Sequence, residues 1–283
     1  MSIHIVMDGA GDLPYAWLEE YDINVIPINI QFEEKTFLQG VELSNEDFYR
    51  AADQSAVIPK TSQPTPKQFV DFYRRIAKLG DTILSLHVTS KLSGTFSSAI
   101  IAARELADQY NIIPFDSATG SAALGYMCKE ARMLERAGAS LQTIMERLEF
   151  IRKNIVVVLT LDTLEYARKS GRVKALQAAL ASVLQVKPIV ILREGALQMA
   201  ERVRTRQKSL EVILETVSDE VGDRLVNLAV VHARAPEAAQ RLIEQLKERF
   251  QCAELIVTEL SIGVAANLGP GTIGIVAYPV EER

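Results

Sequence analysis

The chain has 283 residues, of which 48% are hydrophobic and 24% are charged, a composition typical of a soluble globular protein with one large or two medium domains. Its formal charge of −5 argues against nucleic acid as the main partner, because a phosphate backbone needs a basic surface. Cys128 and Cys252 lack the paired spacing of a metal site or a disulfide framework, so we predict a cytoplasmic protein without a metal.

The sequence shows no export signal and no membrane-spanning segment. The N-terminus enters a strand-like run at once, without a basic region, an apolar core or a cleavage site. The longest apolar runs, such as residues 155–161, are far shorter than the roughly 20 residues that a membrane-spanning helix needs. Any contact with a membrane is therefore expected to be peripheral.

Short apolar strands alternate with helices in the first half of the chain. Strands are expected at residues 4–7, 24–32, 82–88 and 112–115, and helices at residues 67–79, 99–110 and 121–137. This alternation favours a parallel sheet covered by helices on both faces. Thr65, Pro66 and Gln68 have the order of a helix start, with a hydroxyl cap, a proline at the first helical position and a glutamine three residues after the cap.

From about Leu141 the pattern changes. A helix at residues 141–153 and a strand at 155–159 lead to strands at 187–192, 196–204, 227–231, 254–260 and 272–278, with helices at 210–217 and 236–250. Gly195 lies between two of these strands and favours a tight antiparallel turn. We therefore predict a two-domain α/β protein, with a parallel-sheet domain at residues 1–160 and a mixed-sheet domain with helices on one side at residues 161–283.

Three loops rich in hydroxyl groups lie just ahead of predicted helices. They contain Thr-Ser-Gln-Pro at residues 61–64, Leu-Ser-Gly-Thr at residues 92–95 and Asp-Ser-Ala-Thr-Gly at residues 116–120. Helix N-termini carry unpaired N–H donors and partial positive charge, and open α/β sheets bind ligands at the carboxyl ends of their strands. The loops therefore predict a site for a small anionic or polar head group, built from neutral donors.

The residues favour binding over catalysis. The chain has three histidines and neither a serine elbow nor a cysteine paired with a histidine, so no catalytic residue is assigned. His87, five positions before Leu92, is either a structural residue or a ligand or base. Arg202, Arg204 and Arg206 would share one face of a strand, either as a solvated edge or as a docking patch for an acidic protein or a phosphate.

A series of short motifs in a fixed order carries a resemblance to a known family. The motifs are Asp8 with Asp12-Leu13-Pro14, Thr61-Ser62-Gln63-Pro64, Ser90 with Leu92-Ser93-Gly94-Thr95, Asp116-Ser117, Gly171-Arg172, Lys187-Pro188, Arg202 with Arg204, and Gly269-Pro270-Gly271. Over nearly its whole length the chain resembles the DegV family of bacterial fatty-acid-binding proteins, the lipid-presenting subunits of fatty acid kinase. The resemblance implies an α/β/α parallel-sheet domain and a two-layer domain with a mixed six-stranded sheet, with a long-chain fatty acid in a tunnel between them.

The resemblance also implies roles for individual residues. Hydroxyl groups of the loops at residues 61–64 and 92–95 hold the fatty-acid carboxylate in that family. The matching ligand-binding residues here are Thr61 and Ser93, with Ser62, Gly94 and Thr95 near enough to assist. Arg172 and Arg202, with Arg204, match positions where contact with a partner kinase or a product phosphate is implied. The partner supplies ATP and forms the acyl phosphate, so this chain is expected to be a carrier without a cofactor.

The chain departs from the family pattern at a few positions. Asp8-Gly9 and Gln39-Gly40 stand where the family usually has Asp-Ser and Asp-Gly, and Asn267 replaces a histidine two residues before Gly-Pro. Asparagine donates a hydrogen bond but carries no charge, so Asn267 is expected to bind the ligand differently. Two alternatives stay open: a small-molecule kinase subunit resembling dihydroxyacetone kinase, and a regulatory protein that senses lipid.

Overall fold

The computed structural model describes residues 2–54, 58–172 and 186–281. The chain forms two compact units, one made of residues 1–152 with Ser261–Gly263 and the other of residues 153–260 with 264–283. Among the described residues, no helix has both the length and the apolar character that crossing a membrane requires. The described part of the chain also lacks any group of three or more His, Cys, Asp or Glu side chains that would hold a metal ion.

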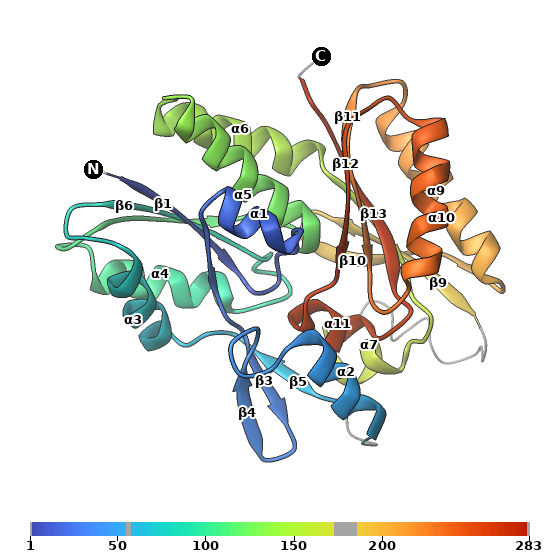
Figure 1. The fold of residues 1–283 in the computed structure, drawn as a ribbon, viewed down its shortest axis with the longest axis horizontal. Coiled ribbons are helices and arrows are strands. Elements are labelled where there is room, and N and C mark those ends of the chain that lie inside the picture. The colour runs from blue at the N-terminus through green and yellow to red at the C-terminus, as the bar shows by residue number, and fades with distance from the viewer. Residues whose placement is uncertain (1, 55–57, 173–185, 282–283) are drawn as a thin grey trace. The chain divides into compact units, whose positions relative to one another are not determined.

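The first unit is built on a four-stranded parallel sheet. In spatial order its strands are β2 (Ile23–Ile26), β1 (Ile3–Asp8), β6 (Thr82–His87) and β7 (Asn111–Asp116). The helices of this unit are α1 (Tyr15–Glu20), α2 (Asn45–Gln54), α3 (Pro66–Ile76), α4 (Thr95–Glu105), α5 (Ser121–Arg136) and α6 (Leu141–Asn154). Figure 1 shows α3 and α4 on one face of the sheet and α5 on the other, which confirms the predicted α/β/α arrangement.

Helix α3 begins as the sequence predicts. The Thr65 side chain accepts the backbone N–H of Gln68, the Gln68 side chain accepts the backbone N–H of Thr65, and Pro66 is the first helical residue. The helix buries Phe69 and Tyr73 against the sheet, and fully burying one such side chain contributes roughly 1.5–3 kcal/mol. The cap sets where the helix starts, and the apolar face sets which side is buried.

The predicted strand at residues 24–32 is wrong, because the segment forms two strands in two sheets. Strand β2 ends at Ile26 and pairs with β1, whereas the next strand joins a separate antiparallel sheet. That sheet has the order β4 (Lys35–Leu38), β3 (Asn29–Phe32) and β5 (Lys60–Ser62). Pro27 lies at the break, and proline has no N–H with which to continue a ladder.

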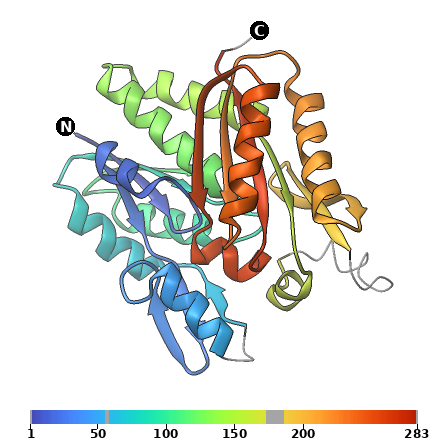
Figure 2. The ribbon, with the colours of Figure 1, turned by 45° about the vertical axis from the view of Figure 1, so that its right-hand side comes forward.

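The second unit contains a mixed six-stranded sheet, as expected. Its strands are, in spatial order, β10 (Ala196–Val203), β9 (Lys187–Arg193), β8 (Val156–Thr160), β13 (Ile273–Pro279), β11 (Val226–His232) and β12 (Cys252–Glu259). Only β11 and β12 are parallel. Helices α9 (Arg206–Val221) and α10 (Pro236–Arg249) cover one face and share an apolar core with it (Figure 2).

Strand pairing also sets where the units divide. The first unit ends at residue 152, before the predicted boundary at residue 160, because β8 pairs with β9 and β13 of the second sheet. The short helices α7 (Glu165–Ser170) and α11 (Ile262–Leu268) complete the second half of the chain. Residues Ser261–Gly263 belong to the first unit, a return of the chain that no sequence pattern indicates.

The expected row of three arginines on one strand is wrong. Strand β10 ends at Val203, so Arg204 lies in the following turn and Arg206 is the first residue of α9. The Thr205 side chain accepts the backbone N–H of Lys208 at 3.2 Å and caps the helix. The sequence did not indicate the helix cap at Thr205, because the alternation of the basic residues around it also fits a strand.

Candidate functional site

Two of the hydroxyl loops lie against each other in the first unit. We call residues 61–64 the TSQP loop and residues 92–95 the LSGT loop. A β-carbon built on Gly94 would lie 2.7 Å from Nε2 and 3.1 Å from Cδ of Gln63. The Gln63 side chain therefore rests directly on Gly94, and this contact joins the TSQP loop to the start of α4.

Thr61 and Ser62 lie on a strand rather than in an open loop. Thr61 pairs with Ile30 in the ladder between β5 and β3, and its side chain is half-buried. Ser62 pairs with Asn29 and is exposed. The strand holds both main chains in extended geometry, so their hydroxyl groups are carried on a fixed backbone.

A pair of amide side chains holds the TSQP loop. Nδ2 of Asn29 donates to the backbone oxygen of Gln63 at 3.1 Å, and Nε2 of Gln68 donates to Oδ1 of Asn29 at 2.9 Å. Oε1 of Gln68 also accepts the N–H of Thr65 at 2.8 Å. Asn29 is buried, so these bonds are shielded from competition with water and fix the loop relative to α3.

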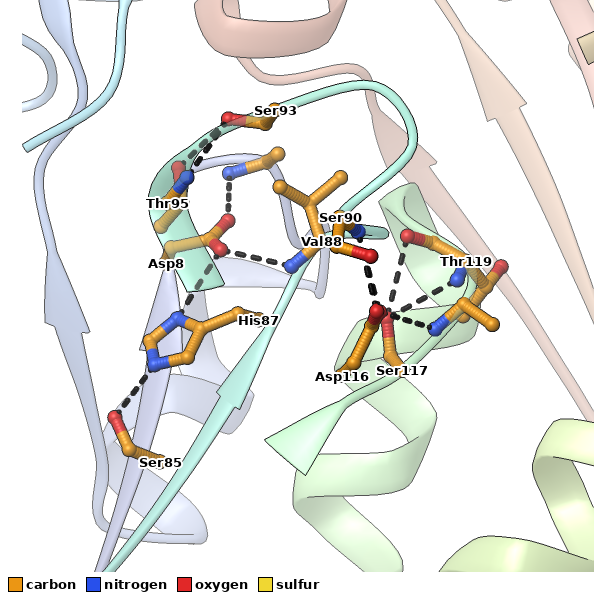
Figure 3. Close-up of polar contacts among 12 residues, drawn as sticks. Asp8, Ser85, His87, Val88, Ser90, Ser93, Thr95, Asp116, Ser117 and Thr119 are labelled. Atoms are coloured by element: carbon orange, nitrogen blue, oxygen red, sulfur yellow. Dashed lines mark hydrogen bonds and ion pairs between the residues drawn. The ribbon is translucent and has the colours of Figure 1, made fainter. Parts of the chain in front are cut away.

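The LSGT loop places two hydroxyl groups at the first turn of α4. Oγ of Ser93 lies 2.8 Å from Oγ1 of Thr95 and accepts the N–H of Thr95 at 3.3 Å (Figure 3). Thr95 is buried, whereas Ser93 and Gly94 are half-buried. Helix α4 starts four residues earlier than predicted, at Thr95 instead of residue 99, because its first turn carries hydroxyl groups and not the apolar periodicity. Backbone donors and the helix dipole favour an anion here.

The third hydroxyl loop supports the LSGT loop. The N–H of Thr89 donates to the oxygen of Thr119 at 2.8 Å, and the oxygen of Thr89 accepts the N–H of Ser93 at 3.2 Å. The Asp116 carboxylate accepts the N–H of Ser90 at 3.3 Å and that of Ala118 at 2.9 Å (Figure 3). The expectation that all three hydroxyl loops meet at one edge of the parallel sheet is confirmed for the loops that follow β6 and β7 and is wrong for the TSQP loop, which follows the small antiparallel sheet through β5.

The strand that leads to the LSGT loop carries a buried polar chain. The Tyr73 hydroxyl donates to Oγ of Ser85 at 2.8 Å, and that oxygen lies 2.8 Å from Nε2 of His87. Nδ1 of His87 lies 3.3 Å from Oδ2 of Asp8 (Figure 3). Burial raises the pKa of the Tyr73 phenol above its ordinary value, so Tyr73 stays a donor. Ser85 and Asp8 therefore engage the two ring nitrogens of His87.

His87 is therefore a structural residue. The order Asp8, His87, Ser85 is that of a hydrolase triad, but all three side chains are fully buried and both ring nitrogens of His87 are engaged. A substrate has no access to Ser85, and His87 has no free nitrogen for covalent attachment. The roles of ligand or base for His87, which the sequence left open, are wrong.

Asp8 ties two loops to the sheet. Its Oδ1 accepts the N–H of Ala10 at 2.9 Å, and its Oδ2 accepts the N–H of Val88 at 2.8 Å. Val88 is the first residue after β6 and begins the path to the LSGT loop. The carboxylate thus satisfies backbone donors that burial would otherwise leave unpaired.

A second buried carboxyl group, Asp12, has a shifted titration. Its Oδ2 accepts the Ser121 hydroxyl at 2.5 Å and its Oδ1 accepts the N–H of Ser261 at 2.8 Å. Burial raises the pKa of Asp12 to about 6, against the opposing effect of the hydrogen bonds from Ser121 and Ser261, and the nearby charge of Asp8 adds to the rise. The folded chain therefore favours the protonated form of the Asp12 carboxyl group at pH values where the group would be ionised in water.

We expect Asp12→Asn to change how stability depends on pH. Because the pKa of folded Asp12, about 6, exceeds the ordinary 3.8, its contribution to stability is complete below pH 3.8 and is lost as the pH rises through 6. Each pKa unit is worth about 1.4 kcal/mol. Urea unfolding at several values between pH 4 and 7 should show that this falling contribution is absent in Asp12→Asn. Exposed Asp108→Asn is the control, and a wild-type pH profile in Asp12→Asn would contradict the assignment.

The other predicted site residues belong to the second unit. Asn267 is half-buried on α11, two residues before the turn at Gly269. Arg202 is exposed near the end of β10, and Arg204 is exposed in the turn that follows. Arg172 is exposed, and its Nη1 donates to the backbone oxygen of Ser170 at 2.9 Å.

Arg206 holds the Gly-Pro-Gly turn after α11, a role that the sequence did not indicate. Nη2 of Arg206 donates to the oxygen of Gly271 at 2.7 Å. Gly271 has φ of +77°, and a β-carbon there would lie 2.6 Å from Cβ of Asp162, so only glycine fits. Burial lowers the pKa of Arg206, which Asp162 partly counteracts. The roles of Gln63, Asp8 and Arg206 all depend on contacts with residues that are distant in the sequence, so local sequence patterns do not indicate them.

Comparisons with known proteins cover the whole chain. A family model described as an uncharacterised protein, DegV family, matches residues 2–280. Protein DegV of Bacillus subtilis is 31% identical over 277 residues, which cover 97% of this chain and 98% of that protein. A DegV domain-containing protein of Streptomyces coelicolor is 33% identical over 280 residues, or 98% of this chain and 99% of the relative.

Solved structures share the fold. The structure that reports fatty acid binding of a DegV family protein from Thermus thermophilus has a TM-score of 0.90 at 30% identity and covers 99% of this chain and 100% of that one. DegV from Bacillus subtilis, described as a fatty acid binding protein, has a TM-score of 0.89 at 30% identity and covers 99% of each chain. Sequence and fold agree, and the chain belongs to the DegV family.

Proposed function

We propose that the chain binds a long-chain fatty acid and holds its carboxylate at the TSQP and LSGT loops. The observation that carries this proposal is the contact of Gln63 with Gly94, which joins the two loops at the first turn of α4. Thr61 and Ser93 are the main donors, and Thr95 assists. The similar structures from Thermus thermophilus and Bacillus subtilis are described as fatty-acid-binding, which supports the same ligand class.

Neutral donors are sufficient for this task. A carboxylate accepts hydrogen bonds from hydroxyl groups and from backbone N–H groups, and the dipole of α4 stabilises its charge without a buried cation. The carboxylates of Asp8 and Asp116 are already occupied by backbone donors and keep the loop main chain in place. Ser62 and Gly94 complete the head-group site, with the apolar tail in a tunnel as the family resemblance implies.

The same proposal makes the protein a carrier and not an enzyme. A separate ATP-dependent fatty acid kinase subunit would phosphorylate the presented carboxylate. Arg172, Arg202 and Arg204 are exposed and carry the fork-shaped guanidinium groups that suit an acidic partner or a phosphate. Asn267 contributes a neutral hydrogen-bond donor where a histidine would contribute a charge. No cofactor is needed by this chain itself.

Identification of the native ligand tests the proposal. Organic extracts of the natively purified protein should contain a long-chain fatty acid by mass spectrometry, in an amount close to one per chain, and a control protein purified in the same way should not. Protein that stays empty after incubation with saturated and unsaturated long-chain acids would contradict the proposal. With loaded protein, ATP and a fatty acid kinase subunit, hydroxylamine should trap the acyl phosphate as a hydroxamate.

A further inference from the structure

Gln63 has a main chain held by a hydrogen bond and a side chain that lies against Gly94 of the LSGT loop. Its backbone oxygen accepts the amide of Asn29 at 3.1 Å, while its own side chain is exposed to solvent. The side-chain amide reaches over to Gly94, where a β-carbon would lie 2.7 Å from Nε2, 3.1 Å from Cδ and 3.6 Å from Oε1. The sequence places Gln63 in the TSQP loop but assigns it no role.

Backbone geometry does not explain why residue 94 is glycine. Gly94 has φ of −79° and ψ of 5°, angles that any residue adopts. The three atoms nearest to an added β-carbon all belong to the Gln63 amide. Gly94 is the N-cap of α4, a position that serine, threonine, asparagine and aspartate also occupy well, so the helix start does not require glycine. The missing side chain makes room for the Gln63 amide.

We propose that Gln63 is a further binding residue, whose amide reaches across Gly94 and donates an N–H to the ligand carboxylate beside Ser93. This inference rests on the proposed fatty-acid binding at the same loops. An amide on a flexible stem suits the role, because it adds a donor without adding a charge and adjusts to the head group. On this proposal residue 94 is glycine because a side chain would block the contact of the Gln63 amide with the ligand, and not because the turn requires glycine.

A double-mutant cycle tests this inference in the full-length protein. Affinities for stearic acid and for the matching alcohol, octadecanol, are measured by competition with a fluorescent fatty acid in the wild type, Gln63→Ala, Gly94→Ala and the double variant. We expect Gln63→Ala to weaken binding of the acid by about ten- to a hundredfold, the value of one charge-assisted hydrogen bond, with little change for the alcohol. Gly94→Ala should cause a similar loss in the wild type and no further loss in Gln63→Ala.

Gln63→Glu tests the effect of charge at this position, and Gln142→Ala is a matched control. Gln63→Glu removes the donor and adds a negative charge, so it should weaken binding of the acid more than Gln63→Ala does. Gln142→Ala, at an exposed position of α6, should bind as the wild type does. The atoms that Gly94→Ala displaces are the far end of a flexible side chain, so its thermal unfolding should stay close to that of the wild type.

The outcomes separate this inference from the proposed function. Additive losses for Gln63→Ala and Gly94→Ala, or equal losses for acid and alcohol, would overturn the role of Gln63 while fatty-acid binding stands. A wild-type protein that binds neither stearic acid nor the fluorescent analogue would overturn both. Coupled losses confined to the acid would support the contact between the amide and the carboxylate.

Discussion

Replacing Thr61 with valine and Ser93 with alanine together should weaken binding of a long-chain fatty acid by about three orders of magnitude. Each hydroxyl is proposed to donate a hydrogen bond to the carboxylate, and a bond to a charged group is worth roughly 1.5–3 kcal/mol. At about 1.4 kcal/mol for each factor of ten, two such losses give this size. Valine keeps the shape of threonine and its fit to β5, so the fold should survive.

Titration with a fluorescent fatty acid measures this loss, and exposed residues provide matched controls. Thr36→Val on β4 of the same small sheet and Ser97→Ala on α4 remove the same groups from exposed positions and should leave the affinity unchanged. Loss of Ser93 also removes the partner of the Thr95 hydroxyl, which lies 2.8 Å away. Full affinity in the double variant would show that the head group binds elsewhere.

Asp8→Ala should lower the free energy of unfolding by about 3–5 kcal/mol. The change removes the acceptor for the ring N–H of His87 at 3.3 Å, and for the backbone N–H groups of Val88 at 2.8 Å and Ala10 at 2.9 Å. Asp8 and His87 are fully buried, so water cannot replace the lost acceptor without opening the core. Urea unfolding measures the difference.

Two further variants serve as controls for the effect of Asp8→Ala on stability. Asp108→Ala removes an exposed carboxylate near the end of α4 and should change stability by less than about 0.5 kcal/mol. Asp8→Asn keeps one acceptor oxygen and should fall between the wild type and Asp8→Ala. A loss below about 1 kcal/mol for Asp8→Ala would show that the buried donors find other partners.

Contact in space joins Gly9 and Gln39, which are far apart in the sequence. Nε2 of Gln39 donates to the oxygen of Gly9 at 2.8 Å, and a β-carbon on Gly9 would lie 2.8 Å from Oε1 of Gln39. A side chain at position 9 would therefore displace the Gln39 amide, which is the far end of a flexible side chain. Gln39 thus rests on Gly9, although 30 residues separate them in the chain.

Sequence patterns predicted features whose signals are local. The cap at Thr65, the apolar face of α3 and the tight turn at Gly195 each depend on residues within about one turn of the chain, and the structure contains all three. Where two patterns overlap, prediction failed. The alternating arginines before α9 fit a strand as well as a helix start, and the apolar run around Pro27 concealed the passage from one sheet to another.

By itself, the sequence determined the α/β class, the order of most strands and helices, and the hydroxyl chemistry of the loops, because periodicity and capping act between near neighbours. Only the tertiary structure decided that Gln63 rests on Gly94 and that His87 is enclosed with Asp8, 79 residues away in the chain. The physical reason is that burial and hydrogen-bond partners are set by how distant segments pack. A hydroxyl, amide or imidazole group on one face of a strand is placed to contact a ligand, whereas the same kind of group on the opposite face forms a structural hydrogen bond.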